Sequence, residues 1–209
     1  SHVQPEKLKR SFISPHQSFP QLKLMIFAEI ENCKNGLPSG IWLKCNSLVD
    51  HRLIELLYEA SQAGVPIEIV ARGICCLRPG VAGLSETITV RSIIGRFLEH
   101  GRIYVFANGG EFLSDKNIVM ISSADLMPRN LRRRVECFMR LENPTIRKQV
   151  LHQIMVALLR DERNAWYLQP DGSYVHPQTD ETSFSCHEYF MSNPSLSGLG
   201  SLAATQDNG

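Results

Sequence analysis

Hydrophobic positions follow two different periods along the first third of the chain. Two segments carry apolar residues every three or four positions and end at glycine-containing stop signals, which is typical of amphipathic helices. Two short runs rich in Ile, Val and Leu lie between and after them, which is typical of buried strands. The pattern therefore predicts helices over residues 22–33 and 49–63 and strands over residues 40–45 and 67–71.

The chain continues this alternation up to residue 177. Glycine and proline punctuate the stretch after the second strand, and two apolar runs flank Asn108-Gly109-Gly110, which signals a β-hairpin. In order, we expect a loop over 73–90, a helix over 91–99, strands over 103–107 and 117–121, a helix over 146–159 and a short strand over 174–176. Strands that alternate with helices predict an α/β fold, with a mixed sheet flanked by helices on both sides.

Composition divides the chain into one folded domain and two ends. Residues 1–11 are polar and predicted to be flexible, and Ser1-His2 resembles a remnant of cloning. Residues 12–177 hold the predicted elements and are expected to form one domain. From Gln178 onward Ser, Thr, Asn, Gly and Asp dominate, so residues 178–209 are predicted to be a polar, disordered tail.

The overall charge and the cysteines narrow the function classes. The 209 residues carry a formal net charge of +1, so no nucleic-acid partner is expected and any anion site must be a local cluster. No apolar run approaches the ~20 residues of a membrane span, so no transmembrane segment is expected. The six cysteines form no C-x-x-C pair and no zinc-binding spacing, which predicts no metal site and favours reduced thiols in a cytoplasmic protein.

Candidate chemistry lies at the ends of two predicted strands. Arg72 directly follows the strand over 67–71, and His100 shortly precedes the strand over 103–107. Binding groups gather at such places, because a rigid scaffold holds them while loops leave room for a ligand. A lone histidine there is more often a solvated or capping residue, so spacing alone does not make His100 functional.

Basic residues near these two positions are mainly arginines, which suit bidentate recognition of phosphate. The set comprises Arg72, Arg78, Arg91, Arg96, Arg102, Arg129, Arg132, Arg133 and Arg134. For Arg91, Arg132 and Arg133 we favour the interpretation of an ordinary surface residue. Arg78, Arg102 and Arg129 are further candidates for phosphate binding beside Arg72.

The tripeptide H-G-R at 100–102 resembles a degraded half of the phospholipase D motif, in which a His and a Lys two residues on are followed by an Asp. Arg102 stands in the place of the Lys and Ala107 in the place of the Asp, so a self-contained nucleophilic His100 is not expected. Asp125 is expected to hold arginines or backbone N–H groups, because a magnesium site needs more oxygen ligands than one carboxylate here could give.

Longer motifs in a fixed order carry a resemblance to a known family. They are NGLPSGIWLKCNSLVD, LYEASQAGVPIEIVARG, RGICCLRPG, LSE, GRFLEH, NGG and SSADLMPRN, and the similarity runs from about Phe12 to about Leu168. The sequence resembles the C-terminal, second phospholipase-D-like domain of polyphosphate kinase, of the type that works through a phosphohistidine. Many rare residues in one order are far more specific than a single short motif.

The resemblance implies that the intact protein reversibly transfers the terminal phosphate of ATP to inorganic polyphosphate. ATP or ADP is then a substrate, and Mg²⁺ is expected to be bound mainly by residues outside this chain. The nucleophilic histidine is expected in an upstream domain of the same polypeptide, so His100 is a supporting residue and this chain alone should have no kinase activity. The resemblance places nucleotide phosphates at Arg72 and His100. It also implies a full-length homo-oligomer in the cytoplasm, with membrane association left open.

Two residues depart from the family pattern. Leu126 stands where the family has Trp, which predicts altered packing, and Arg132 stands where it has Asp, which raises the local positive charge. A competing function remains open, namely a stand-alone phospholipase-D-like phosphodiesterase or polyanion-binding module that dimerises to complete its site. If the family holds, Arg72 and His100 should lie on the same rim of the sheet, brought together by the loop over 73–90 and the helix over 91–99.

Overall fold

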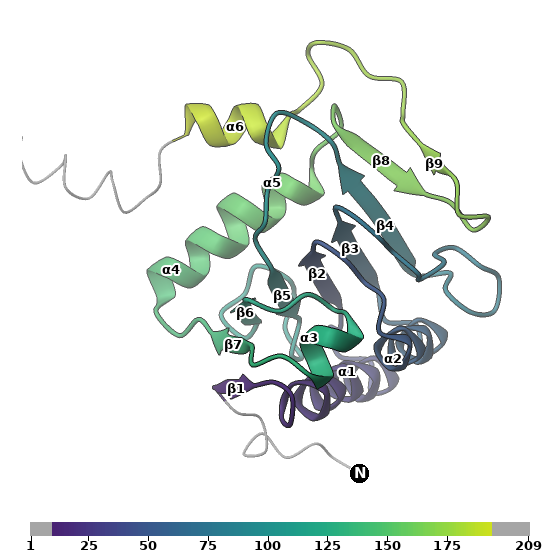
Figure 1. Ribbon diagram of the computed structural model, residues 1–209, viewed down its shortest axis with the longest axis vertical. Coiled ribbons are helices and arrows are strands. Elements are labelled where there is room, and N and C mark those ends of the chain that lie inside the picture. Colours follow the sequence, from purple (N-terminus) through teal and green to yellow (C-terminus); the bar gives the residue numbers. More distant parts are fainter. Residues whose placement is uncertain (1–9, 194–209) are drawn as a thin grey trace, which may run out of the picture.

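The computed structural model describes residues 10–193, which fold around one mixed sheet (Figure 1). Nine strands of this part of the chain lie in the order β1-β7-β6-β5-β2-β3-β4-β8-β9. They are β1 (Ser11–Ile13), β2 (Ile41–Cys45), β3 (Ile67–Ala71), β4 (Ile88–Ile93), β5 (Ile103–Phe106), β6 (Ile118–Ser122), β7 (Cys137–Arg140), β8 (Ala165–Leu168) and β9 (Tyr174–Val175). β2, β3 and β4 run parallel, and the other neighbouring pairs are antiparallel.

Helices cover both faces of this sheet (Figure 1). They are α1 (Ser18–Lys34), α2 (His51–Gln62), α3 (Pro128–Arg132), α4 (Pro144–Lys148), a π-helical stretch (Gln149–Met155), α5 (Val156–Leu159) and α6 (Cys186–Ser192). Leu57 of α2 shares one core with Ile69 of β3, whereas Met155 shares a separate core with Val105 of β5. Successive residues of a strand point to opposite faces, so both faces of the sheet are buried. The predicted mixed sheet with flanking helices is confirmed.

Most of the predicted elements exist at the predicted places. β2, β3, β5 and β6 match the four expected strands, and β5 and β6 pair antiparallel as the hairpin signal predicts. α2 begins where Asp50 caps it, because the Asp50 carboxylate accepts the backbone N–H groups of Arg52 at 3.1 Å and Leu53 at 3.3 Å. The helical stretch from α4 to α5 and the short strand β9 also lie where they are expected.

The predicted helix over 91–99 is wrong. Instead, β4 runs from Ile88 to Ile93, parallel to β3. The loop predicted over 73–90 therefore ends before Ile88. Residues 94–102, after β4, have no regular structure. Arg91 is buried inside β4 rather than at the surface, and its guanidinium forms an ion pair with Glu68 of β3. A charged residue within a strand interrupts the hydrophobic pattern, although its partner on the next strand makes its burial tolerable. Tertiary pairing therefore overrides the local pattern here.

The predicted tail is wrong for its first part. Residues 186–192 form α6, with Cys186 fully buried and His187 only 3% exposed. The rest of the predicted tail, 194–209, and the N-terminal stretch 1–9 with Ser1-His2 lie outside the described residues. Within residues 10–193, no helix is both long and apolar enough to cross a membrane.

Candidate functional site

Arg72 and His100 meet at one edge of the sheet. Arg72 follows the carboxyl end of β3, and its backbone N–H donates to the carbonyl oxygen of Cys45 at 3.2 Å. β5 runs antiparallel to β2, so its first residues lie at the carboxyl ends of β2 and β3. As a result Arg72 Nη2 lies 3.5 Å from His100 Nδ1. The expected common rim is present, although β4 and the irregular segment 94–102, rather than a helix, carry the chain to it.

A buried lysine fixes the backbone around His100. Lys44 is 2% exposed, and its ammonium group donates to the carbonyl oxygen of Gly101 at 2.7 Å. The same group pairs with Glu99 Oε2 at 2.5 Å, while the backbone N–H of Gly101 donates to Glu99 Oε1 at 2.6 Å. A Cβ on Gly101 would lie 2.6 Å from Glu99 Oε1, so a larger residue there would push the Glu99 carboxylate away. His100 is therefore held from both of its sequence neighbours.

Arg102 and Asp125 form the second contact pair of the rim. Arg102 Nη2 lies 2.9 Å from Asp125 Oδ2, and Arg102 Nη1 donates to the carbonyl oxygen of His100 at 3.0 Å. Asp125 Oδ1 accepts the backbone N–H groups of Asn46 at 2.8 Å and Ser47 at 3.2 Å. The structural interpretation of Asp125 is confirmed. Both terminal nitrogens of Arg102 are thus engaged within the chain, and its role in phosphate binding stays a prediction.

The pKa values of this pair follow from those contacts. Burial works against ionisation of Asp125, but the hydrogen bonds from Arg102 and from the two backbone N–H groups outweigh it, so the pKa of Asp125 lies below its usual value. The hydrogen bond to Asp125 in turn raises the pKa of Arg102. Both groups are therefore charged at neutral pH.

A small pocket of about 250 Å³ opens beside Arg72. Gly73, Ser92, Ile94, Trp166 and Tyr174 line it together with Arg72. Arg72 Nε is shielded from solvent and has no hydrogen-bond partner among residues 10–193. Arg52, Arg91 and Arg102 also have a shielded Nε without a hydrogen-bond partner in the described part of the chain, so this atom does not by itself mark a ligand site.

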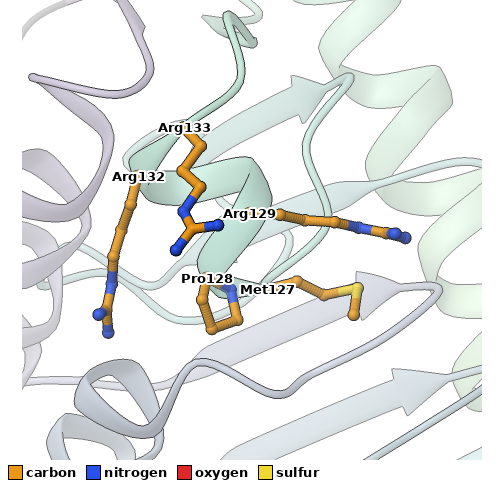
Figure 2. Close-up of a pocket in the computed structure, with 5 residues that line it drawn as sticks. All are labelled: Met127, Pro128, Arg129, Arg132 and Arg133. Carbon is orange, nitrogen blue, oxygen red and sulfur yellow. The ribbon is translucent and has the colours of Figure 1, made fainter.

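Arg129 lies on α3, which follows Asp125 at the same edge. A β-bridge between Leu48 and Leu126 joins the start of this segment to the turn after β2. Met127, Pro128, Arg129, Arg132 and Arg133 line a second pocket, of about 330 Å³. Figure 2 shows Arg129 extending along the opposite side of α3 from Arg132. Arg129 is exposed, so its guanidinium is accessible at the rim.

Of the two departures from the family pattern, only Arg132 has a local explanation. Leu126 is 1% exposed, and its carbonyl oxygen accepts the backbone N–H groups of Val49 at 2.9 Å and Asp50 at 3.0 Å. Arg132 Nη2 lies 3.3 Å from the buried carboxylate of Asp50. The extra positive charge is therefore compensated within the chain. Neither residue touches Arg72 or His100 in the described contacts.

Arg78 lies apart from the lining of the Arg72 pocket. Its side chain occupies the space beside Gly172 in the β8–β9 turn, where any Cβ would collide with the guanidinium. Its backbone N–H donates to the hydroxyl of Tyr58 at 2.9 Å, and its carbonyl oxygen accepts the hydroxyl of Ser85 at 2.6 Å. The structure thus brings Arg72, His100 and Arg102 into contact and places the Arg78 side chain against the β8–β9 turn.

Sequence reasoning did not find Lys44, Glu99 or His187. Lys44 interrupts the apolar run Ile41-Trp-Leu-Lys-Cys45, and a charge inside an otherwise buried strand was a usable signal. Glu99 precedes His100 directly and gave no separate signal. His187 lies in a segment whose polar composition predicted a tail.

Comparison with known proteins agrees with the motifs. Residues 11–186 match the family model described as "Polyphosphate kinase C-terminal domain 2". The chain belongs to this family. It is 52% identical over 199 residues to a polyphosphate kinase from Erythrobacter litoralis, covering 95% of this chain and 28% of that protein. It is 44% identical over 171 residues to a polyphosphate kinase from Neisseria meningitidis, covering 82% of this chain and 24% of that protein.

A solved relative has the same fold. The crystal structure of polyphosphate kinase from Porphyromonas gingivalis superimposes with a TM-score of 0.81 at 33% sequence identity, covering 95% of this chain and 30% of that chain. The present chain thus spans less than a third of the polyphosphate kinases it matches. The family match contains Arg72, His100, Asp125 and Arg129, and it ends at residue 186, where α6 begins.

Proposed function

We propose that this domain binds the reacting phosphates in an ATP–polyphosphate phosphotransferase. The intact enzyme would reversibly transfer the terminal phosphate of ATP to inorganic polyphosphate, and the nucleophilic histidine would lie in an upstream domain of the same polypeptide. The observation that supports this most strongly is the pair formed by Arg72 and His100, which face each other at 3.5 Å on the rim of the sheet. On this proposal the isolated chain has no kinase activity.

The chemistry of the pair suits a transferred phosphoryl group. A 3.5 Å separation is too long for a strong hydrogen bond, so both groups keep capacity for a ligand. The Arg72 guanidinium would bind two phosphate oxygens. The imidazole of His100 would share the charge that develops on the phosphoryl group. Arg129 would extend the positive rim toward the rest of the nucleotide or polyphosphate chain.

Magnesium, if it accompanies the nucleotide, would be bound mainly by the upstream domains. The oxygens of Asp125, a carboxylate of this network, already accept Arg102 and two backbone N–H groups. This donor set does not fit a Mg²⁺ site, which prefers several free oxygen ligands. We assign no step of the reaction to a metal held by this chain.

The remaining properties are proposed from family membership. We expect the full-length protein to be a homo-oligomer located in the cytoplasm, and association with the membrane stays open. The free cysteines of this chain suit a reducing compartment. A stand-alone phosphodiesterase is not favoured, because the matched relatives carry the name polyphosphate kinase and the chain corresponds to one part of them.

The proposal is tested in the full-length protein that contains this chain. With ATP and a polyphosphate primer, Arg72→Ala should lower turnover by roughly 2–4 kcal/mol of transition-state stabilisation, because one preorganised donor to the transferred group is lost. Arg10→Ala is a matched control, since Arg10 is a surface arginine paired with Glu142. Equal turnover of the two variants would contradict the proposal.

A further inference from the structure

The segment that leads to His100 depends on a few specific hydrogen bonds. Residues 94–99 have no regular structure, and Ile94, Phe97 and Leu98 are 64%, 43% and 71% exposed. Exposed side chains contribute little packing energy, so the path of the segment relies on what its backbone contacts. Two contacts precede the Lys44 anchor: the N–H of Ile94 donates to the carbonyl oxygen of Asn164 at 3.0 Å, and the N–H of Phe97 donates to His187 Nδ1 at 3.3 Å.

His187 fits this segment closely. It is 3% exposed, and its ring lies edge-on to the ring of Phe97 with centroids 5.3 Å apart. A Cβ on Gly95 would lie 2.5 Å from His187 Nδ1, so the imidazole fills the space that a side chain at position 95 would need. Because Nδ1 accepts the N–H of Phe97, the ring proton of the neutral form is on Nε2.

The helix that carries His187 is itself well anchored. Asp161 is 1% exposed, and its carboxylate accepts the backbone N–H groups of Cys186 at 2.8 Å and Asn164 at 2.6 Å. Asn164 Nδ2 donates to the hydroxyl of Ser185, which caps α6, at 2.9 Å. Asn164 is also the residue that binds Ile94. One network around Asp161 therefore supplies both contacts to the segment before His100.

This anchoring reaches the rim of the sheet. In Figure 1 the segment leaves the tip of β4, passes the start of α6 and enters β5. His100 is three residues after Phe97, and Lys44 holds the other side of the same short stretch. Without the His187 contact, residues 95–99 would lose their hydrogen bond to α6. His100 would then occupy a wider range of positions relative to Arg72.

We propose that His187 is a positioning residue for His100, acting through the backbone N–H of Phe97, and that α6 is therefore part of the phosphate site. α6 begins at the last residue of the matched family model, and His187 is the residue after that boundary. The consequence for phosphate binding rests on the proposed function. The coupling between His187 and residues 94–99 does not depend on the proposed function, and hydrogen exchange of the Phe97 amide measures it directly.

The experiment compares His187→Asn with His187→Leu in the full chain. Asn places an amide oxygen near the position of Nδ1 and keeps the acceptor, whereas Leu fills the space without one. Met191→Ala is the matched control. Met191 and His187 both line a pocket of about 250 Å³ beside α6, but no hydrogen bond joins Met191 to residues 94–99 in the described part of the chain. Amide hydrogen exchange of Phe97 and calorimetric binding of tripolyphosphate are measured for each variant.

We expect His187→Leu to expose the Phe97 amide to exchange and to weaken tripolyphosphate binding by about tenfold, the scale of one lost hydrogen bond. His187→Asn should restore most of both, and Met191→Ala should change neither. Gly95→Ala should reproduce the effect of His187→Leu, because the added Cβ displaces the imidazole. If His187→Leu does not fold, Gly95→Ala takes its place in the experiment. Unchanged Phe97 exchange in Gly95→Ala and His187→Leu, or equal behaviour of Asn and Leu, would overturn the proposal. If the unmodified chain binds no tripolyphosphate, the proposed function fails while Phe97 exchange still decides the role of His187.

Discussion

The ammonium group of Lys44 lies 2.5 Å from Glu99 Oε2 and 2.7 Å from the carbonyl oxygen of Gly101. The Lys44 side chain is 2% exposed, whereas that of Glu99 is 33% exposed. The two partners therefore differ in how they respond to loss of the other. A buried ammonium cannot recover its hydration, while a carboxylate at the surface can turn toward water.

We therefore expect Glu99→Gln to cost more stability than Lys44→Met. Glu99→Gln leaves a buried charge without its counter-ion and should lower the free energy of unfolding by roughly 3 kcal/mol. Lys44→Met replaces the buried charge by an apolar side chain of similar length and should cost roughly 1 kcal/mol. Urea unfolding of the two variants measures both values. A larger loss of stability in Lys44→Met than in Glu99→Gln would contradict this account of the Lys44–Glu99 pair.

Asp125 should stabilise the domain at neutral pH and lose this effect in acid. Its pKa is lowered in the folded state, so its contribution is present above the unfolded value of 3.8 and disappears as the pH falls through the lower folded value. Asp125→Asn should cost roughly 3 kcal/mol at pH 7. The difference between the parent and the variant should shrink below about pH 4. A difference that stays constant down to pH 2 would contradict the lowered pKa.

Glu29 should show the opposite dependence. Burial raises the pKa of Glu29 to about 7, even though its carboxylate accepts the N–H groups of Gly40 at 3.0 Å and Asn108 at 2.7 Å. The folded state therefore holds an extra proton between the unfolded pKa of 4.5 and about 7, and stability falls as the pH rises through that window. The slope from this group is at most about 1.4 kcal/mol per pH unit.

Comparison with Glu29→Gln isolates this contribution, since the amide does not titrate. The parent should lose stability relative to the variant between pH 4.5 and 7, with no further change above that range. Chemical denaturation at half-unit pH steps gives the difference. A difference that grows in favour of the parent as the pH rises would mean that Glu29 is ionised throughout.

Hydrophobic periodicity was sufficient for elements whose buried positions are mostly apolar, even where a charge interrupts them, as Lys44 does in β2. β2, β3, α1 and α2 follow from it, because their buried positions carry Ile, Val, Leu and Met at regular spacing. β4 did not follow, because Arg91 is buried in it and is neutralised by Glu68 on a different strand. A compensating charge that comes from another element has no signature in the local pattern.

The candidate site likewise contains residues that the sequence indicated and residues that it did not. The strand end pointed to Arg72, whereas His100 was selected through the family resemblance, and the role of both residues in phosphate binding stays a prediction. Their contact depends on β5 running antiparallel to β2, and pairing between distant strands is not encoded in either strand alone. Lys44 and His187 were missed for a related reason. Each acts on a backbone segment that only the folded chain brings to it.

The most direct test of the phosphate site is calorimetric binding of tripolyphosphate to this chain and to Arg72→Ala, with Arg10→Ala as the control. Arg72 offers charge-assisted donors to the ligand beside His100, whereas Arg10 is a surface arginine paired with Glu142. The account predicts that Arg72→Ala weakens binding by roughly tenfold or more, while Arg10→Ala binds as the parent does. Equal affinity of the parent and Arg72→Ala would contradict it.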